Sequence, residues 1–198
     1  SLYYLFIFMK LVAVLNRYEN SKEIDLYYMK ALKKFEATPV LINEDNLDLL
    51  EKCGGILLTG GDNKGTLDDY LIKYSFDNKI PLLGICQGMQ SMALYNTNNT
   101  LVDVKNHYNC KHLVNLNNSK FKDIVGKDEI IVNSYHHQQV LDSKEFKIVG
   151  KSSDGVIEVV EGVYSFFQIG VEWHPERMLD DESSDLLFSK FINCVIEK

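Results

Sequence analysis

The sequence predicts an α/β protein built on a doubly wound, mostly parallel sheet with a small antiparallel β insertion. Short apolar runs alternate with amphipathic segments over residues 10–94, which is the β-α-β-α order of a parallel sheet with crossovers on both faces. Between residues 101 and 160 the segments become short and alternate in polarity, as antiparallel strands do. The 198 residues are 45% hydrophobic and are divided by no proline-rich or glycine-rich linker, so we expect a single domain over residues 1–198.

The elements are expected in the following order along the chain. Aliphatic residues predict a first strand at Lys10–Leu15, and a broad apolar face predicts a first helix near Ser21–Phe35. Further parallel strands are expected around residues 39–41, 56–58, 80–85 and 166–173, helices around residues 47–50, 67–76, 89–94 and from Ser183–Ser184 onward, and antiparallel strands at segments such as 129–133 and 146–149.

An apolar stretch, Ser1–Phe8, precedes the first strand. It lacks the basic n-region and the small-residue cleavage site of a signal peptide, and Lys10 interrupts the apolar run. We therefore expect neither secretion nor membrane insertion. We interpret residues 1–8 as a dispensable extension in front of a start at Met9.

Charge and cysteine content narrow the class of protein. The net charge is −7 and only two arginines are present among 21 basic residues, so nucleic acid is not an expected partner; the excess of lysine is typical of an AT-rich bacterial genome. The four cysteines show neither C-x-x-C spacing nor a zinc pattern with the histidines, which indicates a reduced, cytoplasmic protein. His136 and His137 are adjacent and would point to opposite faces of a strand. We expect no metal and no other cofactor.

The segment 84–88 (Gly-Ile-Cys-Gln-Gly) has the pattern of a nucleophile elbow. It places Cys86 between a buried strand and a helix, and the sharp turn between them needs residues without side chains at Gly84 and Gly88. A thiol at a helix N-terminus is expected to favour the thiolate. The alternative is a small buried core cysteine, but the flanking glycines favour the nucleophile.

A second segment, His174-Pro175-Glu176, follows the last predicted strand and supplies a base with a carboxylate beside it. Imidazole is the usual group that takes the proton of a thiol nucleophile, and a carboxylate orients it. Because ligands bind outside the carboxyl ends of parallel strands, this segment should share one rim with Cys86, with the Gly60-Gly61 loop and with Arg17. Arg17 is either a bidentate clamp for a carboxylate or phosphate or a solvated side chain at a strand exit.

These two segments, together with residues 55–62, 133–138 and 154–158, resemble the class I glutamine amidotransferase superfamily, and within it the γ-glutamyl hydrolase branch, peptidase family C26. The resemblance implies a flavodoxin-like fold in which Cys86 is the nucleophile, His174 the general base and acid, and Glu176 the orienting carboxylate. It also implies an oxyanion hole formed by backbone amides of Gly60, Gly61 and Gln87.

The same resemblance implies a set of substrate contacts. Ser134, Tyr135 and His137 would lie near the amino and carboxylate groups of the glutamyl moiety, and Gln90 would contact it from the elbow helix, unless Gln90 is an ordinary packing residue. His136 is open to a role as a satisfied core histidine. No role is assigned to His107 or His112.

The resulting prediction is a cysteine amidohydrolase that cleaves a γ-glutamyl amide and releases glutamate. The loop after Gly60-Gly61 is shorter than in the resembling hydrolases, so the site should be more open; with Arg17, it is also similar to γ-glutamyl-CDP-amidate hydrolase of capsule biosynthesis, which forms glutamate and cytidine diphosphoramidate. One alternative is a glutaminase subunit that delivers ammonia to a separate synthetase partner. The other is a non-catalytic binding protein on the same fold.

Overall fold

The computed structural model describes residues 9–15, 17, 26–61 and 65–197. The interpreted extension Ser1–Phe8 and the beginning of the first predicted helix lie outside these residues. The strands are β1 (Lys10–Leu15), β2 (Ala37–Ile42), β3 (Gly55–Leu58), β4 (Leu82–Ile85), β5 (Val102–Asp103), β6 (Tyr108–Leu116), β7 (Glu129–Tyr135), β8 (Gln138–Gln139), β9 (Phe146–Ser152), β10 (Ile157–Gly162) and β11 (Gln168–Val171). The helices are α1 (Leu26–Lys34), the 3-10 helix η1 (Glu44–Lys52), α2 (Thr66–Asn78), α3 (Gln87–Leu94), α4 (Lys120–Val125), the 3-10 helix η2 (Pro175–Arg177) and α5 (Glu182–Cys194).

A nine-stranded sheet runs through the molecule in the order β2-β1-β3-β4-β11-β10-β9-β6-β7. Its first five strands are parallel. Among them β3, β4 and β11 are buried along their whole length, as strands covered on both faces are. The carboxyl ends of β1, β3, β4 and β11 therefore meet at one edge of the sheet. The predicted fold class is confirmed.

The antiparallel strands expected between residues 101 and 160 are present, and they form one edge of the sheet rather than a small insertion alone. β10, β9, β6 and β7 continue the main sheet as antiparallel strands, and a separate two-stranded pair consists of β5 and β8. The chain between β6 and β7 also forms α4, a six-residue helix that the sequence analysis did not predict. Ser119 caps its start by accepting a hydrogen bond from the Lys122 amide, and Gly126 ends it in the left-handed conformation.

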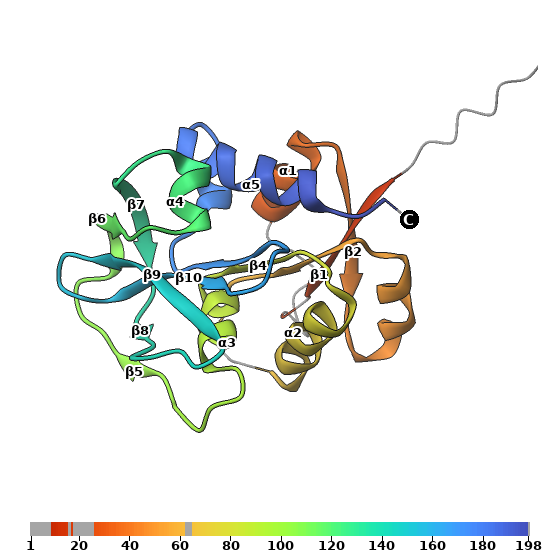
Figure 1. The fold of residues 1–198 in the computed structure, drawn as a ribbon, viewed down its shortest axis with the longest axis horizontal. Coiled ribbons are helices and arrows are strands. Elements are labelled where there is room, and N and C mark those ends of the chain that lie inside the picture. The colour runs from red at the N-terminus through yellow and green to blue at the C-terminus, as the bar shows by residue number, and fades with distance from the viewer. Residues whose placement is uncertain (1–8, 16, 18–25, 62–64, 198) are drawn as a thin grey trace, which may run out of the picture.

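Helices cover both faces of the sheet, as Figure 1 shows, with α1, α4 and α5 on one side and α2 and α3 on the other. Each layer has its own hydrophobic core: one is centred on aromatic residues of α4 and α5 with Trp173, and the other on aliphatic residues of α2 and α3. α5 begins one residue earlier than predicted, because the Asp181 carboxylate accepts hydrogen bonds from the amides of Ser183 and Ser184. Among the residues described, no helix has the length and apolarity needed to cross a membrane.

Candidate active site

Cys86 occupies a strained turn between β4 and α3. Its φ of 50° and ψ of −110° lie in a region that residues with side chains rarely adopt. The flanking glycines permit the turn: a Cβ at Gly88 would lie 2.2 Å from the carbonyl oxygen of Leu58, and a Cβ at Gly84 would lie 2.8 Å from the backbone of Gly88. The predicted need for side-chain-free residues on both sides of Cys86 is confirmed.

The environment of the Cys86 sulfur favours the neutral thiol, which corrects the expectation of a thiolate. Burial is the main cause and raises the pKa of Cys86 well above its usual value, with the nearby Glu172 carboxyl acting in the same direction. The Gln87 backbone amide lowers the pKa, but by less. The helix N-terminus therefore does not outweigh desolvation, and the thiol needs a base at the moment of attack.

Alkylation of the free protein tests this protonation state. We expect the rate of Cys86 modification by iodoacetamide to rise with pH and to inflect above pH 9, because burial holds the proton on sulfur. Mass spectrometry of the peptide that contains Cys86 measures the rate separately from that of the other cysteines. An inflection below about pH 7.5, typical of a preformed thiolate, would contradict the prediction.

His174 is held by a carboxylate and by the edge strand of the sheet. Its Nδ1 lies 2.6 Å from Oε1 of Glu176, which is fully buried. The side-chain amide of Asn133, on β7, brackets the His174 backbone: the His174 N–H donates to Asn133 Oδ1 at 2.8 Å, and Asn133 Nδ2 donates to the His174 carbonyl at 2.9 Å. The sequence analysis gave Asn133 no role, although a polar residue at the end of the apolar run Ile130–Val132 was a usable signal.

Cys86 and His174 meet at Gly60. A Cβ built on Gly60 would lie 3.0 Å from His174 Cε1 and 3.6 Å from the Cys86 Cβ, so both side chains pack against the same point of the backbone. Because Nδ1 of His174 faces Glu176, the remaining ring nitrogen, Nε2, is the one available to a thiol. This arrangement places a candidate base on the same side of Gly60 as the Cys86 side chain.

The backbone amide of Gly60 makes a hydrogen bond that the sequence did not predict. Its N–H donates to the hydroxyl of Tyr28, on α1, at 2.9 Å. In the conformation described, a phenol oxygen from another element accepts this hydrogen, so the predicted role of Gly60 in an oxyanion hole requires this hydrogen bond to break. Gly61 lines the cavity at Cys86, and the Gln87 amide lies beside the sulfur.

Arg17 forms a buried bidentate salt bridge with Asp68 of α2. Nη1 donates to Asp68 Oδ2 at 2.8 Å, Nη2 contacts Oδ1, and Nε donates to the Thr59 carbonyl at 2.9 Å. A Cβ at Gly61 would lie only 2.6 Å from Arg17 Cδ. The Arg17 side chain therefore packs against the Thr59–Gly61 loop and is hydrogen-bonded to it. Both expectations for Arg17 are corrected, because the guanidinium is neither solvated nor available to clamp a ligand.

Replacing Arg17 therefore tests a positioning role. We expect Arg17→Ala to lower kcat at least about 10-fold for every substrate that wild type turns over, because the loop beside Cys86 loses its support. Thermal melting should show a large destabilisation, since breaking a buried ion pair costs about 3–5 kcal/mol. The double variant Arg17→Ala/Asp68→Ala, which leaves no stranded carboxylate, should regain part of that stability. A loss confined to a substrate with a phosphorylated leaving group would restore the clamp interpretation instead.

A cavity of about 280 Å³ opens at Cys86. Tyr135 and His137 line it, as expected, and the His137 ring stacks on Tyr108 with 4.3 Å between centroids. Ser134 does not line it, because its hydroxyl donates inward to the His107 carbonyl. The remaining lining residues are Gly61, Gln87, Gln90, Asp103, His136 and Gln138.

Gln90 lines the cavity, and its side-chain amide is also held by hydrogen bonds to neighbouring residues. Its Nε2 donates to Glu172 Oε1 at 2.6 Å and to the Gln138 carbonyl at 3.2 Å. Burial raises the pKa of Glu172 well above its usual range, so this carboxyl favours its protonated form. Both interpretations of Gln90, as a cavity residue and as a packing residue, hold for parts of its side chain.

Comparison with known proteins supports the resemblance. Residues 63–176 match the model of the peptidase C26 family. This chain is 33% identical over 144 residues to a Schizosaccharomyces pombe protein named as a glutamine amidotransferase. The match covers 62% of this chain and 54% of that protein. The glutamine-hydrolyzing GMP synthase of Clostridium botulinum is 35% identical over 134 residues, 65% of this chain and 26% of that protein. The chain thus spans about half, or less, of the length of these curated relatives.

A solved structure of similar extent shows the same fold. The crystal structure of a glutamine amidotransferase from Thermotoga maritima matches with a TM-score of 0.69 and 16% identity, over 93% of this chain and 97% of that chain. The family match begins two residues after Gly61 and includes Cys86, His174 and Glu176. The chain therefore belongs to the peptidase C26 family, within the class I glutamine amidotransferase superfamily.

Proposed function

We propose that this protein hydrolyses a γ-glutamyl amide through a thioester on Cys86. The observation that carries the proposal is the strained Cys86 turn at a cavity, packed against the same glycine as the His174–Glu176 pair. Backbone strain at a cysteine beside a histidine that is itself oriented by a carboxylate is the arrangement of an activated nucleophile.

Each proposed step follows from these positions. Cys86 Sγ attacks the γ-carbonyl carbon while its proton passes to His174 Nε2. The tetrahedral intermediate then breaks its C–N bond as His174 returns the proton to the departing nitrogen. Water, deprotonated by the same imidazole, attacks the thioester; glutamate leaves and the thiol is restored. Glu176 accepts a hydrogen bond from the Nδ1–H of His174 in every step. This hydrogen bond fixes the tautomer and stabilises the imidazolium.

The oxyanion needs donors near Cys86. We assign this role to the backbone amides of Gln87 and Gly61, and to that of Gly60 once the Tyr28 hydroxyl releases it. Each such donor contributes about 3 kcal/mol to the stabilisation of the intermediate. The glutamyl group would contact Gln90, Tyr135 and His137, and a cavity of about 280 Å³ suits a ligand of this size.

Two features of the sequence suggested γ-glutamyl-CDP-amidate as the substrate. One of them, Arg17, does not support this substrate in the structure, because its guanidinium binds Asp68. The short connection between Gly61 and α2 still supports an open site for a large leaving group, although residues 62–64 lie outside the described part. We therefore retain a substituted γ-glutamyl amide as the proposed substrate class and γ-glutamyl-CDP-amidate as the most specific candidate.

A glutaminase subunit that serves a separate synthetase is the second candidate. The Gly60 N–H bound to Tyr28 favours it, because an oxyanion donor withheld in the isolated chain is what a partner-dependent glutaminase requires. The similarity to a protein named as a glutamine-hydrolyzing GMP synthase points in the same direction.

Glutamate release by the purified protein distinguishes the two candidates. The substrates are glutamine, a simple γ-glutamyl alkylamide and γ-glutamyl-CDP-amidate. A hydrolase should turn over a substituted amide alone and far faster than glutamine, because binding energy from the substituent aids the transition state.

Tyr28→Phe sharpens the test, since it removes the oxygen that accepts the Gly60 hydrogen. A subunit should be inactive on all three substrates alone and gain glutaminase activity in this variant. A protein that stays inactive on all three substrates, also as Tyr28→Phe, would favour the non-catalytic alternative.

A further inference from the structure

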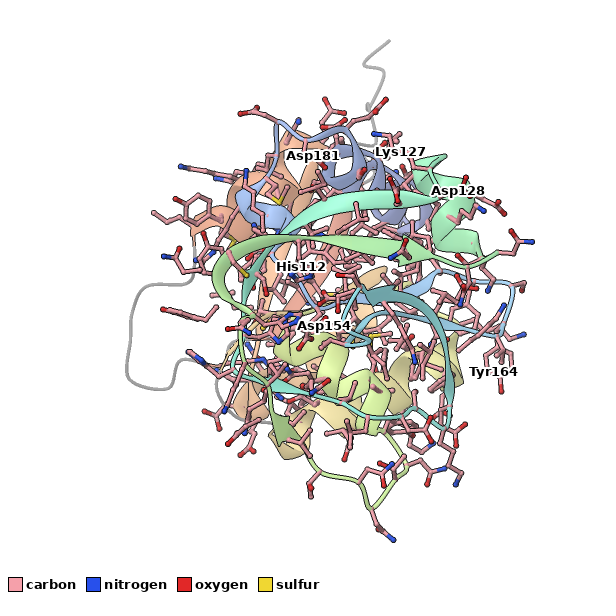
Figure 2. The ribbon with its side chains drawn as sticks, turned by 90° about the vertical axis from the view of Figure 1, so that its left-hand side faces the viewer. His112, Lys127, Asp128, Asp154, Tyr164 and Asp181 are labelled. Atoms are coloured by element: carbon pink, nitrogen blue, oxygen red, sulfur yellow. The ribbon has the colours of Figure 1, made fainter. Side chains whose placement is uncertain are left out.

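A buried cluster of histidines and carboxylates lies next to the catalytic cavity, and the proposed reaction does not use it. His107 precedes β6, His112 lies on β6, His136 follows β7 and Glu158 lies on β10. The rings of His112 and His136 lie 4.7 Å and 4.9 Å from the ring of His107, between centroids. Figure 2 labels His112 and also Asp154, which approaches the cluster from the turn before β10.

Hydrogen bonds on the outer side of the cluster fix two of the ring tautomers. His107 Nε2 lies 3.0 Å from Asp154 Oδ2, and His136 Nδ1 lies 2.8 Å from the Gln138 carbonyl, which can only accept. When these nitrogens donate, His107 Nδ1 and His136 Nε2 carry lone pairs. A histidine that donates one N–H outward to a carboxylate or carbonyl is oriented as metal-binding histidines are.

The lone pairs converge on a carboxylate. His107 Nδ1 lies 3.5 Å and His136 Nε2 3.8 Å from Glu158 Oε1, and ligand atoms of the three residues lie within 4.8 Å of one another. Among the described residues, none of these atoms has a hydrogen-bond partner of acceptable geometry. His112 Nε2 approaches the same Glu158 oxygen to 2.9 Å and is also unsatisfied. Several acceptors facing each other out of water are costly unless a cation lies between them.

We propose that His107 Nδ1, His136 Nε2 and a Glu158 oxygen bind one Zn²⁺ ion. Tetrahedral Zn²⁺ with bonds of about 2.0–2.1 Å separates neighbouring ligand atoms by about 3.3–3.4 Å, close to the 3.5 Å and 3.8 Å spacings to Glu158. Imidazole-rich ligands favour Zn²⁺ and related transition ions over Mg²⁺ or Ca²⁺.

The proposed ion has a structural role, because its three ligands are buried and come from three separate segments of the chain. It joins β6 and β10 to the segment after β7, and that segment supplies Tyr135, His136, His137 and Gln138 to the cavity wall. The sequence argument against a metal considered the spacing of the cysteines and histidines and the adjacent pair His136 and His137. The structure separates this pair, since His137 is exposed and stacked on Tyr108, and it brings His107 and Glu158 to His136 instead. The inference does not depend on the proposed reaction.

Zinc binding to the full chain tests the proposal. The experiment uses Cys86→Ala protein, in which the thiol is no longer present to bind the ion together with His174. The protein is freed of metal with a chelator and is then titrated with Zn²⁺ in competition with a fluorescent indicator. We expect one ion per chain and a rise in melting temperature. His136→Gln and Glu158→Gln in the same background should bind at least about 100-fold more weakly, whereas His137→Gln, the matched neighbour, should bind as the parent does.

Co²⁺ substitution in the parent protein gives a readout that does not require the ligand variants to fold. Visible bands of tetrahedral coordination should appear with one equivalent. The proposal is overturned if the parent binds no Zn²⁺ at micromolar concentration, or if binding persists unchanged in a folded Glu158→Gln variant. It is also overturned if NMR shows the His107 ring still protonated on both nitrogens with Zn²⁺ present, because a proton would then occupy the place of the ion.

Discussion

Cys86→Ala is expected to reduce glutamate release by at least about 10⁴-fold while the protein remains folded. Removing the nucleophile removes the thioester route, and what remains is the binding and oxyanion contribution alone. The substitution keeps the side chain small at a buried position, so the melting temperature should change little. The measurement is single-turnover glutamate release from the best substrate found for wild type.

The other cysteines provide the matched controls. Cys53 is buried in the core of η1 and α2, and Cys110 and Cys194 are partly exposed; Cys53→Ala, Cys110→Ala and Cys194→Ala should each retain activity within about threefold. Retention of more than a few per cent of wild-type activity by Cys86→Ala would remove the covalent mechanism.

His174→Ala and Glu176→Gln should differ in severity. We expect the first to lower kcat about 10⁴-fold, because it removes the proposed acceptor for the proton of a thiol whose pKa burial has raised. The second keeps a hydrogen-bond acceptor 2.6 Å from Nδ1 but loses the negative charge that stabilises the imidazolium, so we expect a loss of about 10²- to 10³-fold. Steady-state kinetics of both variants measure this difference. If Glu176→Gln lowered kcat more than His174→Ala, the two role assignments would be wrong.

The parts of the site that the sequence predicted are local in the chain. The Cys86 turn is encoded by glycines two residues away, and the His174–Glu176 contact spans two residues, so spacing and residue type suffice to find them. The parallel strands were predictable for the same reason, because each is a short apolar run between helices.

The features that escaped prediction depend on pairing across the chain. Arg17 meets Asp68, and Tyr28 meets Gly60, only after α1 and α2 pack on the sheet. The cluster of His107 and Glu158 forms because β10, β9 and β6 are neighbours in the sheet, an order that nothing in their local patterns specifies. A polar residue whose partner lies about 50 positions away gives no periodic signal.

The two hydrogen bonds between Asn133 and the His174 backbone connect the proposed base to an edge strand of the sheet. β7 is the last strand of the sheet and pairs with β6 along one side only. Edge strands open by local fluctuation at a lower free energy than the core, as amide hydrogen exchange detects in many proteins. Each opening of β7 at Asn133 releases the two hydrogen bonds that hold the base. On heating, we therefore expect the fraction of molecules with a misplaced imidazole to grow before the sheet melts, so that activity is lost at a lower temperature than the fold.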